Sequence, residues 1–187
     1  RAVRMDEPDL LALTSQTIAE GGVVAWARGR GEVGQRALGT RSLLADPRDR
    51  RSLERLNIIK GREMWRPVAP SILAEHIDSV MATPVGSPAK FMLAAGEVRH
   101  SVRLDLPAVT HVDGSARPQR VEKSTNEPYW ELIDRFRMAT GQPVVINTSL
   151  NLAGEPIVSN AEDAVSTFTR SPLMTGMVLG NYWVTHD

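Results

Sequence analysis

The sequence predicts an α/β (α+β) fold, a twisted mixed sheet flanked by helices. Two observations lead to this class. Helix-like and strand-like patterns alternate along the 187 residues, a length that suffices for one large domain or two small ones. The strand-like runs are short and apolar, and turn-forming residues such as glycine and proline punctuate the chain between many of the elements. No internal repeat and no low-complexity segment interrupts this alternation.

Four segments have the apolar spacing and the end signals of helices. They are residues 9–20, 46–61, 128–140 and 161–169. In the second segment, Asp46 is a favourable N-cap, and Pro47 fits the first helical position, where its missing N–H costs nothing. Gly141 ends the third helix, and Asn160 precedes a first turn whose two acidic residues suit the helix dipole.

Seven apolar runs have the length and composition of strands. They are residues 23–27, 67–73, 90–95, 109–112, 144–146, 177–179 and 182–184. The run 23–27 is typical of a buried strand, and the run 144–146 of a central one. A stretch rich in proline and glycine, residues 83–88, separates the second strand from the third. The last two runs finish the predicted sheet.

The composition excludes several classes of function. Lys plus Arg and Asp plus Glu number 22 each, so no overall field steers the protein to nucleic acid or to a membrane surface. Cysteine is absent, which excludes disulfides, thiolate metal sites and a cysteine nucleophile. No apolar run approaches the roughly 20 residues that span a bilayer, and we expect a cytoplasmic protein without membrane or nucleic-acid partners. The chain opens with Arg1 and no start methionine, so we expect a piece of a longer polypeptide.

Two separated motifs predict an anion site. The first, Lys60-Gly61-Arg62-Glu63-Met64-Trp65-Arg66-Pro67, gathers three cations within seven residues. The second, Asn147-Thr148-Ser149-Leu150-Asn151, is a polar turn directly after the apolar run 143–146. Cations in a shaped loop bind phosphate or carboxylate, and a small polar turn at a strand end binds the neutral part of a ligand. Neither segment has the composition of a core, so together they indicate a binding site.

A glycine-rich segment, residues 29–42, carries further arginines. Arg30, Arg36 and Arg41, together with Ser42, follow a predicted strand and lie among four glycines. Glycine lets the backbone approach a ligand closely, and guanidinium groups hold phosphate oxygens in two parallel bonds. The segment lacks the Gly-Lys-Ser/Thr ending of a P-loop and the spacing of a dinucleotide-binding loop. A solvated turn with surface arginines explains this segment equally well when it is taken alone.

A third polar group lies in residues 111–119. His111 and Asp113 would share one face of a strand, but one histidine and one aspartate are too few ligands for a metal site. A structural histidine followed by a turn at Asp113 is the simpler interpretation. Arg117 is the attractive member, as another anion contact. Ser149 lacks the sequence context of a nucleophile elbow, so we predict neither serine-hydrolase chemistry nor a metal site.

Five motifs, in the same order, resemble the C-terminal domain of O-carbamoyltransferases that modify nodulation factors and antibiotics. They are residues 29–48, 60–70, 111–119, 147–158 and 178–182. The first contains Arg36-Ala37-Leu38-Gly39-Thr40-Arg41-Ser42-Leu43-Leu44-Ala45-Asp46-Pro47-Arg48. The resemblance covers essentially the whole chain. It implies one domain over residues 1–187, a transferase, and a role in antibiotic biosynthesis or a related tailoring reaction.

That domain is similar in fold to the YrdC family, whose Lys-x-Arg and Ser-x-Asn motifs would fall on Lys60 with Arg62 and on Ser149 with Asn151. The resemblance implies that the domain converts carbamoyl phosphate and ATP to carbamoyl-adenylate, with release of phosphate and pyrophosphate. An N-terminal actin-like domain, expected to lie outside this chain, would then transfer the carbamoyl group to an acceptor hydroxyl. Mg²⁺ would arrive with the ATP and not in a protein cage.

The reaction concentrates negative charge, so fixed cations are expected to do most of the catalysis. The expected catalytic residues, at carbamoyl phosphate and its departing phosphate, are Lys60, Arg66 and Arg117. The expected substrate and nucleotide contacts are Arg36, Arg41, Ser42, Arg62, Asn147, Ser149 and Asn151. Within this set, Arg36 and Arg41 would face the nucleotide phosphates. Lys60 is expected to be solvated until the ligand arrives.

Two other interpretations stay open. The domain could be a nucleotide- or RNA-binding module of YrdC-like fold without chemistry, although the even net charge and the few aromatic residues weigh against RNA. It could also serve only to brace a partner domain, but the intact set of cations speaks against that. The sequence does not specify the acceptor, and it is compatible with a monomer and with a homodimer.

Overall fold

The computed structural model describes all residues from 1 to 187 and places eight strands in one sheet. In spatial order these are β1 (Ala2–Arg4), β10 (Tyr182–Val184), β9 (Gly176–Leu179), β2 (Val24–Ala27), β3 (Arg41–Ala45), β8 (Val144–Ser149), β4 (Ala69–Leu73) and β7 (Gln119–Val121). Neighbouring strands are antiparallel except in the pairs β2–β9 and β4–β7. A separate ribbon pairs β5 (Gly96–Glu97) with β6 (Ser115–Ala116). The large sheet is therefore mixed and mostly antiparallel, which confirms the predicted fold class.

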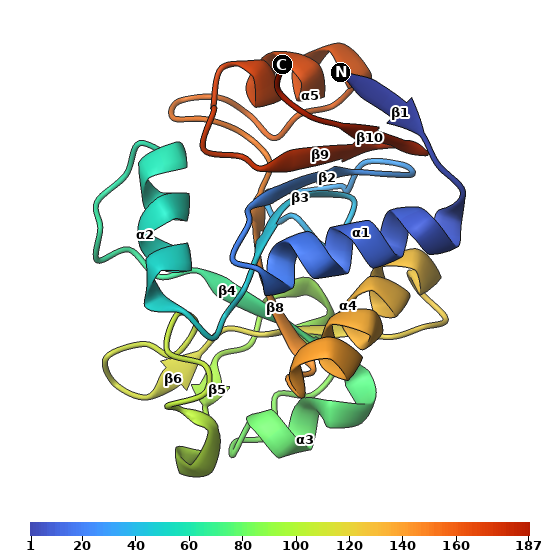
Figure 1. The fold of residues 1–187 in the computed structure, drawn as a ribbon. Helices are drawn as coiled ribbons and strands as arrows, with labels where there is room; N and C mark the ends of the chain where they lie inside the picture. The colour runs from blue at the N-terminus through green and yellow to red at the C-terminus, as the bar shows by residue number, and fades with distance from the viewer.

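Five α-helices and three short 3₁₀ helices complete the fold (Figure 1). They are α1 (Glu7–Ala19), α2 (Arg50–Ile59), α3 (Ile77–Val80), α4 (Glu127–Thr140), α5 (Ala161–Thr169), η1 (Ala74–His76), η2 (Ser87–Phe91) and η3 (His100–Val102). Helices α1 and α4 pack against each other, and α2 and α5 lie apart from this pair (Figure 1). No helix is both long and apolar enough to cross a bilayer.

Each face of the sheet has its own apolar core. One core of 14 buried residues includes Tyr129 and Phe136 of α4, and the other, of 27 buried residues, takes in α2, α5 and the segment after β4. Alternation along β8 assigns Val145 to the first core and both Val144 and Ile146 to the second. Because burying one such side chain contributes about 1.5–3 kcal/mol, β8 is held firmly from both sides.

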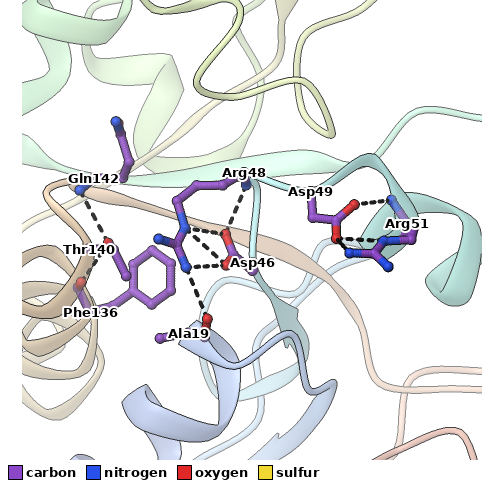
Figure 2. A network of polar contacts seen from close by, with 8 residues as sticks. All are labelled: Ala19, Asp46, Arg48, Asp49, Arg51, Phe136, Thr140 and Gln142. Atoms are coloured by element: carbon purple, nitrogen blue, oxygen red, sulfur yellow. Dashed lines mark hydrogen bonds and ion pairs between the residues drawn. The ribbon is translucent and has the colours of Figure 1, made fainter.

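The N-cap of the second helix is Asp49 and not Asp46, so this helix begins three residues later than expected. Asp49 caps α2, and its carboxylate accepts a hydrogen bond from the backbone N–H two residues on, at 2.9 Å. Asp46 instead pairs with the Arg48 guanidinium at 2.6 Å (Figure 2). Arg48 also donates to Ala19 O at the end of α1 and lies 5.5 Å from the Phe136 ring centroid. The predicted cap residue, Asp46, thus belongs to an ion pair that links α1, the start of α2 and α4. The sequence around Asp46 fits an N-cap and an ion-pair partner equally well.

Five of the seven predicted strands are confirmed, and two are wrong. Residues 90–95 begin in η2 and continue through Met92, which adopts a left-handed conformation with φ 54°. Residues 109–112 form turns, although Val109 is buried in the larger core. Apolar residues in both runs pack into the protein without joining a sheet. Conversely, β1, β3 and β7 were not predicted, because polar or charged residues interrupt their short sequences.

Candidate functional site

The two predicted anion-site motifs meet at the end of strand β8. Lys60 is the C-cap residue of α2, and its Nζ donates to Ser149 O at 2.7 Å, to Ser149 Oγ at 3.0 Å and to Asn151 Oδ1. The Ser149 hydroxyl donates to the same Asn151 oxygen at 2.6 Å. The expected proximity of Lys60 and Ser149, which lie 89 residues apart in the sequence, is confirmed.

Lys60 is buried, so the expectation of a solvated lysine is wrong. Its exposed fraction is only 9%, because the side chain runs between the end of α2 and the end of β8. Burial, and then the charge of Arg62, lower the pKa of Lys60 to about 7. In the ligand-free protein the ammonium group is therefore a clamp on Ser149 and Asn151, and it loses its charge in the neutral pH range.

A buried asparagine, which the sequence analysis missed, shapes the loop that follows α2. The Asn57 side chain is fully buried, and its Nδ2 donates to Met64 O and to Arg66 O at 3.0 Å each. Its Oδ1 accepts a hydrogen bond from Arg62 Nε at 2.6 Å. These bonds close the loop and hold the Arg62 guanidinium in place. Asn57 lies four residues after Leu53, on the apolar face of α2, and this spacing was the available signal.

A small cavity of about 130 Å³ opens beside this loop. Its lining residues are Gln35, Arg36, Ala37, Arg62, Pro67, Val68, Ala69, Met92, Arg117, Asn147, Thr148 and Ser149. Burial first, and neighbouring cations second, lower the pKa of both Arg62 and Arg117. Arg36 lines this cavity together with Arg117. Because no carboxylate lines the cavity, an anion is its complementary ligand.

Three residues around the cavity each keep a buried polar atom without a hydrogen-bond partner. The atoms are Arg36 Nε, Arg62 Nη2 and Asn147 Oδ1. An unpaired buried polar group costs about 1–3 kcal/mol, and most such groups in native proteins are paired. Three of them at one cavity indicate a place where a ligand supplies the missing partners.

A larger cavity of about 550 Å³ shares Gln35 and Ser149 with the small one. Its other lining residues are Gly31, Glu32, Gly34, Arg41, Asn151, Glu155, Pro156, Ile157, Val158 and Ser159. The glycine-rich segment and the chain that follows β8 thus form its walls. The two cavities meet where the polar turn of β8 begins, which gives room for two ligands side by side.

Glu32 holds the glycine-rich segment in shape, a role that was not predicted. Its Oε1 accepts hydrogen bonds from the backbone N–H groups of Leu38, Thr40 and Arg41 at 2.7, 2.8 and 3.2 Å. The Arg41 guanidinium donates to the backbone carbonyls of Arg28, Gly29 and Thr40. The segment is therefore an ordered loop and not a solvated turn. A single acidic residue among glycines and arginines was the available signal.

The structure does not bring every predicted residue to the cavities. Ser42 is fully buried in β3, its Oγ accepts a hydrogen bond from Gly39 N at 3.2 Å, and it lines neither cavity. The glycine-rich segment predicts a loop at Ser42, whereas β3 begins one residue before it. Arg66 lines neither cavity, and its half-exposed side chain pairs with Glu63 at 3.2 Å.

The segment around His111 is a structural turn. The Nδ1 atom of His111 lies 3.2 Å from Ser115 Oγ. The Asp113 carboxylate accepts hydrogen bonds from the backbone N–H and the hydroxyl of Ser115. Burial lowers the pKa of His111. The simpler interpretation of this segment is confirmed, and Arg117 alone reaches the cavity. No group of three histidine, aspartate or glutamate side chains is placed to hold a metal ion.

Residues 15–186 match the family described as Carbamoyltransferase C-terminus, and the chain belongs to this family. It is 46% identical to nodulation protein NolNO of Sinorhizobium fredii over 178 residues, which are 94% of this chain and 26% of that protein. It is 43% identical to the 3'-hydroxymethylcephem-O-carbamoyltransferase of Amycolatopsis lactamdurans over 169 residues, 90% of this chain and 32% of that protein. The chain thus spans about a quarter to a third of the length of these relatives, and the predicted family is confirmed.

Two solved structures share the fold. Sua5 of P. abyssi, crystallised with L-threonine, superposes with a TM-score of 0.65 at 16% identity, over 96% of this chain and 48% of that one. Full-length HypF in its phosphate- and nucleotide-bound form superposes with a TM-score of 0.66 at 14% identity. The match covers 93% of this chain and 25% of the HypF chain. At these identities the likeness concerns the fold alone, and it confirms the expected YrdC-like architecture.

Proposed function

We propose that this domain converts carbamoyl phosphate and ATP to carbamoyl-adenylate, and that a separate actin-like domain of the same polypeptide transfers the carbamoyl group to an acceptor hydroxyl. The observation that carries the proposal is the small cavity, where Arg36, Arg62 and Arg117 meet without a carboxylate. Membership of a carbamoyltransferase family supports it, as does the phosphate- and nucleotide-bound HypF of the same fold. Because ATP is a substrate, we place the protein in the cytoplasm.

Two balanced steps make up the proposed reaction. Water cleaves carbamoyl phosphate to carbamate and inorganic phosphate. A carbamate oxygen then attacks the α-phosphorus of ATP, so that a new P–O bond forms while the bond to pyrophosphate breaks. Both steps build up charge on phosphate oxygens, and guanidinium groups already held in position stabilise that charge without rearranging.

The two adjoining cavities support a division of the substrates. Carbamoyl phosphate would occupy the small, cationic cavity, and ATP with its Mg²⁺ the larger one, with the α-phosphate beside Ser149, which lines both. Lys60 would then reach a phosphate oxygen by giving up one of its bonds to Ser149 or Asn151. Arg41 would support the nucleotide by shaping the loop. Arg66 would contact the departing phosphate only after release from its present ion pair.

Mass spectrometry of products tests this function. The 187-residue chain, supplied with ATP, Mg²⁺ and carbamoyl phosphate, should form carbamoyl-adenylate or its hydrolysis product AMP, with pyrophosphate. Omission of carbamoyl phosphate is the control and should abolish pyrophosphate release. ATP binding without turnover, or RNA retention that weakens steeply with salt, would favour the binding module instead. Carbamoylation of an acceptor by this chain alone would show that the transfer site is misplaced.

A further inference from the structure

The small cavity presents one acceptor among cationic donors. Asn147 on β8 is 1% exposed and lines the cavity, and its Oδ1 is buried without a hydrogen-bond partner. The two other unpaired buried atoms at the cavity, Arg36 Nε and Arg62 Nη2, are donors. A ligand that satisfies all three is an anion that also carries an N–H or O–H group. An acyl phosphate without such a donor satisfies only the arginines.

Backbone carbonyls determine the orientation of the Asn147 amide. Its Nδ2 donates to Ala37 O at 3.1 Å and to Gln119 Oε1 at 2.8 Å. Gln119 is oriented in turn, because its Nε2 donates to Leu38 O at 2.7 Å. The Ser71 hydroxyl donates to Gln119 Oε1 at 2.6 Å and completes this buried network. Turning the Asn147 amide over would set its oxygen against two acceptors, so Oδ1 is left as the atom available to a ligand.

We propose that Asn147 Oδ1 accepts an N–H of the carbamoyl group and so selects carbamoyl phosphate over acyl phosphates that lack this donor. The inference rests on the proposed function and names the substrate atom that the site recognises. The arginines bind the phosphate and cannot distinguish what it carries. Acetyl phosphate has nearly the same shape, but it sets a methyl group against Oδ1 and leaves the acceptor buried and unpaired.

The first test compares carbamoyl phosphate with acetyl phosphate as ligands of the unaltered chain, by titration calorimetry without nucleotide. Acetyl phosphate should bind about 10- to 100-fold more weakly, the factor that corresponds to leaving one buried polar group unpaired. Equal affinities overturn the inference and leave the proposed function standing. If neither compound binds, the proposed function fails, and this inference fails with it.

The second test removes the acceptor. In Asn147→Leu, which keeps the branching of the side chain but has no acceptor, carbamoyl phosphate should lose its advantage and bind within about twofold of acetyl phosphate. Ser71→Ala is the matched control, because it takes a hydroxyl from the same network, yet Ser71 does not line the cavity. It should keep the preference. A preference that survives in Asn147→Leu, or that disappears equally in both variants, overturns the inference. If Asn147→Leu does not fold, the comparison of ligands on the unaltered chain decides.

Discussion

Two groups of arginines in this protein are equal in number but differ in their partners. The cavity group lines the small cavity and consists of Arg36, Arg62 and Arg117. The helix group lines a cavity of about 480 Å³ between the end of α1 and the start of α2 and consists of Arg48, Arg51 and Arg55. Each group brings three guanidinium groups to a hollow in the surface. The number of cations therefore does not distinguish them.

The partners of the arginines do distinguish the two groups. Arg48 and Arg51 pair with Asp46 and Asp49 at 2.6 Å each, as Figure 2 shows, and Arg55 donates to a backbone carbonyl just after α1. The cavity group has no carboxylate partner in its cavity and keeps unpaired buried donors. A cluster of cations is an anion site only where the folded protein leaves its donors without partners.

The largest effect is expected from Arg36→Ala. The loss of one fixed cation should lower carbamoyl-phosphate-dependent ATP turnover by about 10²–10³-fold. The free energy of unfolding should change by less than about 0.5 kcal/mol, because Arg36 Nε has no protein partner to lose. Turnover assays and thermal melts measure both. Arg51→Ala, from the helix group, is the matched control and should keep full turnover. Equal losses in the two variants would erase the distinction between the groups.

Lys60 represents a third situation, a buried cation with partners but without a carboxylate. In the unfolded chain a lysine keeps its charge up to about pH 10.5, whereas folded Lys60 loses it near pH 7. Between these values the unfolded state binds one more proton, so the free energy of unfolding should rise with pH, by a few kcal/mol in order of magnitude. Urea melts at pH 7 to 10 measure the rise, and Lys60→Met should lack it. The same slope in both proteins would contradict the assignment.

Arg48→Ala should affect stability and leave catalysis alone. It strips the nearly buried Asp46 carboxylate of its ion pair and should lower the free energy of unfolding by about 1–3 kcal/mol. Turnover per folded molecule should stay unchanged, because Arg48 lines neither candidate ligand cavity. Denaturant titration and turnover at saturating substrate check the two claims. A turnover defect without a loss of stability would move the helix group into the candidate site.

The smallest effect is expected from Arg66→Ala. Its ion pair with Glu63 is half exposed, and such pairs contribute about 0–1 kcal/mol. Stability should therefore hardly change, and turnover should fall by less than about tenfold if Arg66 stays outside the cavities as in the ligand-free protein. A loss as large as that of Arg36→Ala would restore Arg66 to the catalytic set and show that its loop moves on binding.

Sequence patterns predicted those parts of the molecule in which the signal is local. The apolar run 144–146 predicted strand β8. The two polar motifs predicted that Lys60 and Ser149 lie close together. Strand β3 was missed because Arg41 and Ser42 open it, and a strand that starts with two polar residues resembles a loop. The burial of Ser42 could not be anticipated without that strand.

The distant backbone partners of buried polar residues gave no usable signal. Gln119 donates to Leu38 O across 81 positions, and Asn147 donates to Ala37 O across 110. A sequence motif does not encode such a distance, because the sheet order brings the two segments together. For the same reason the cavity group and the helix group could not be told apart before their partners were known.

A crystal structure of this chain with bound carbamoyl phosphate tests the central claim most directly. We predict the phosphate in the small cavity, with guanidinium nitrogens of Arg36 and Arg117 within about 3 Å of its oxygens. The helix group should stay without a ligand in the same crystal. Phosphate bound at Arg48 and Arg51, with the small cavity free of it, would contradict the claim that unpaired donors identify the anion site.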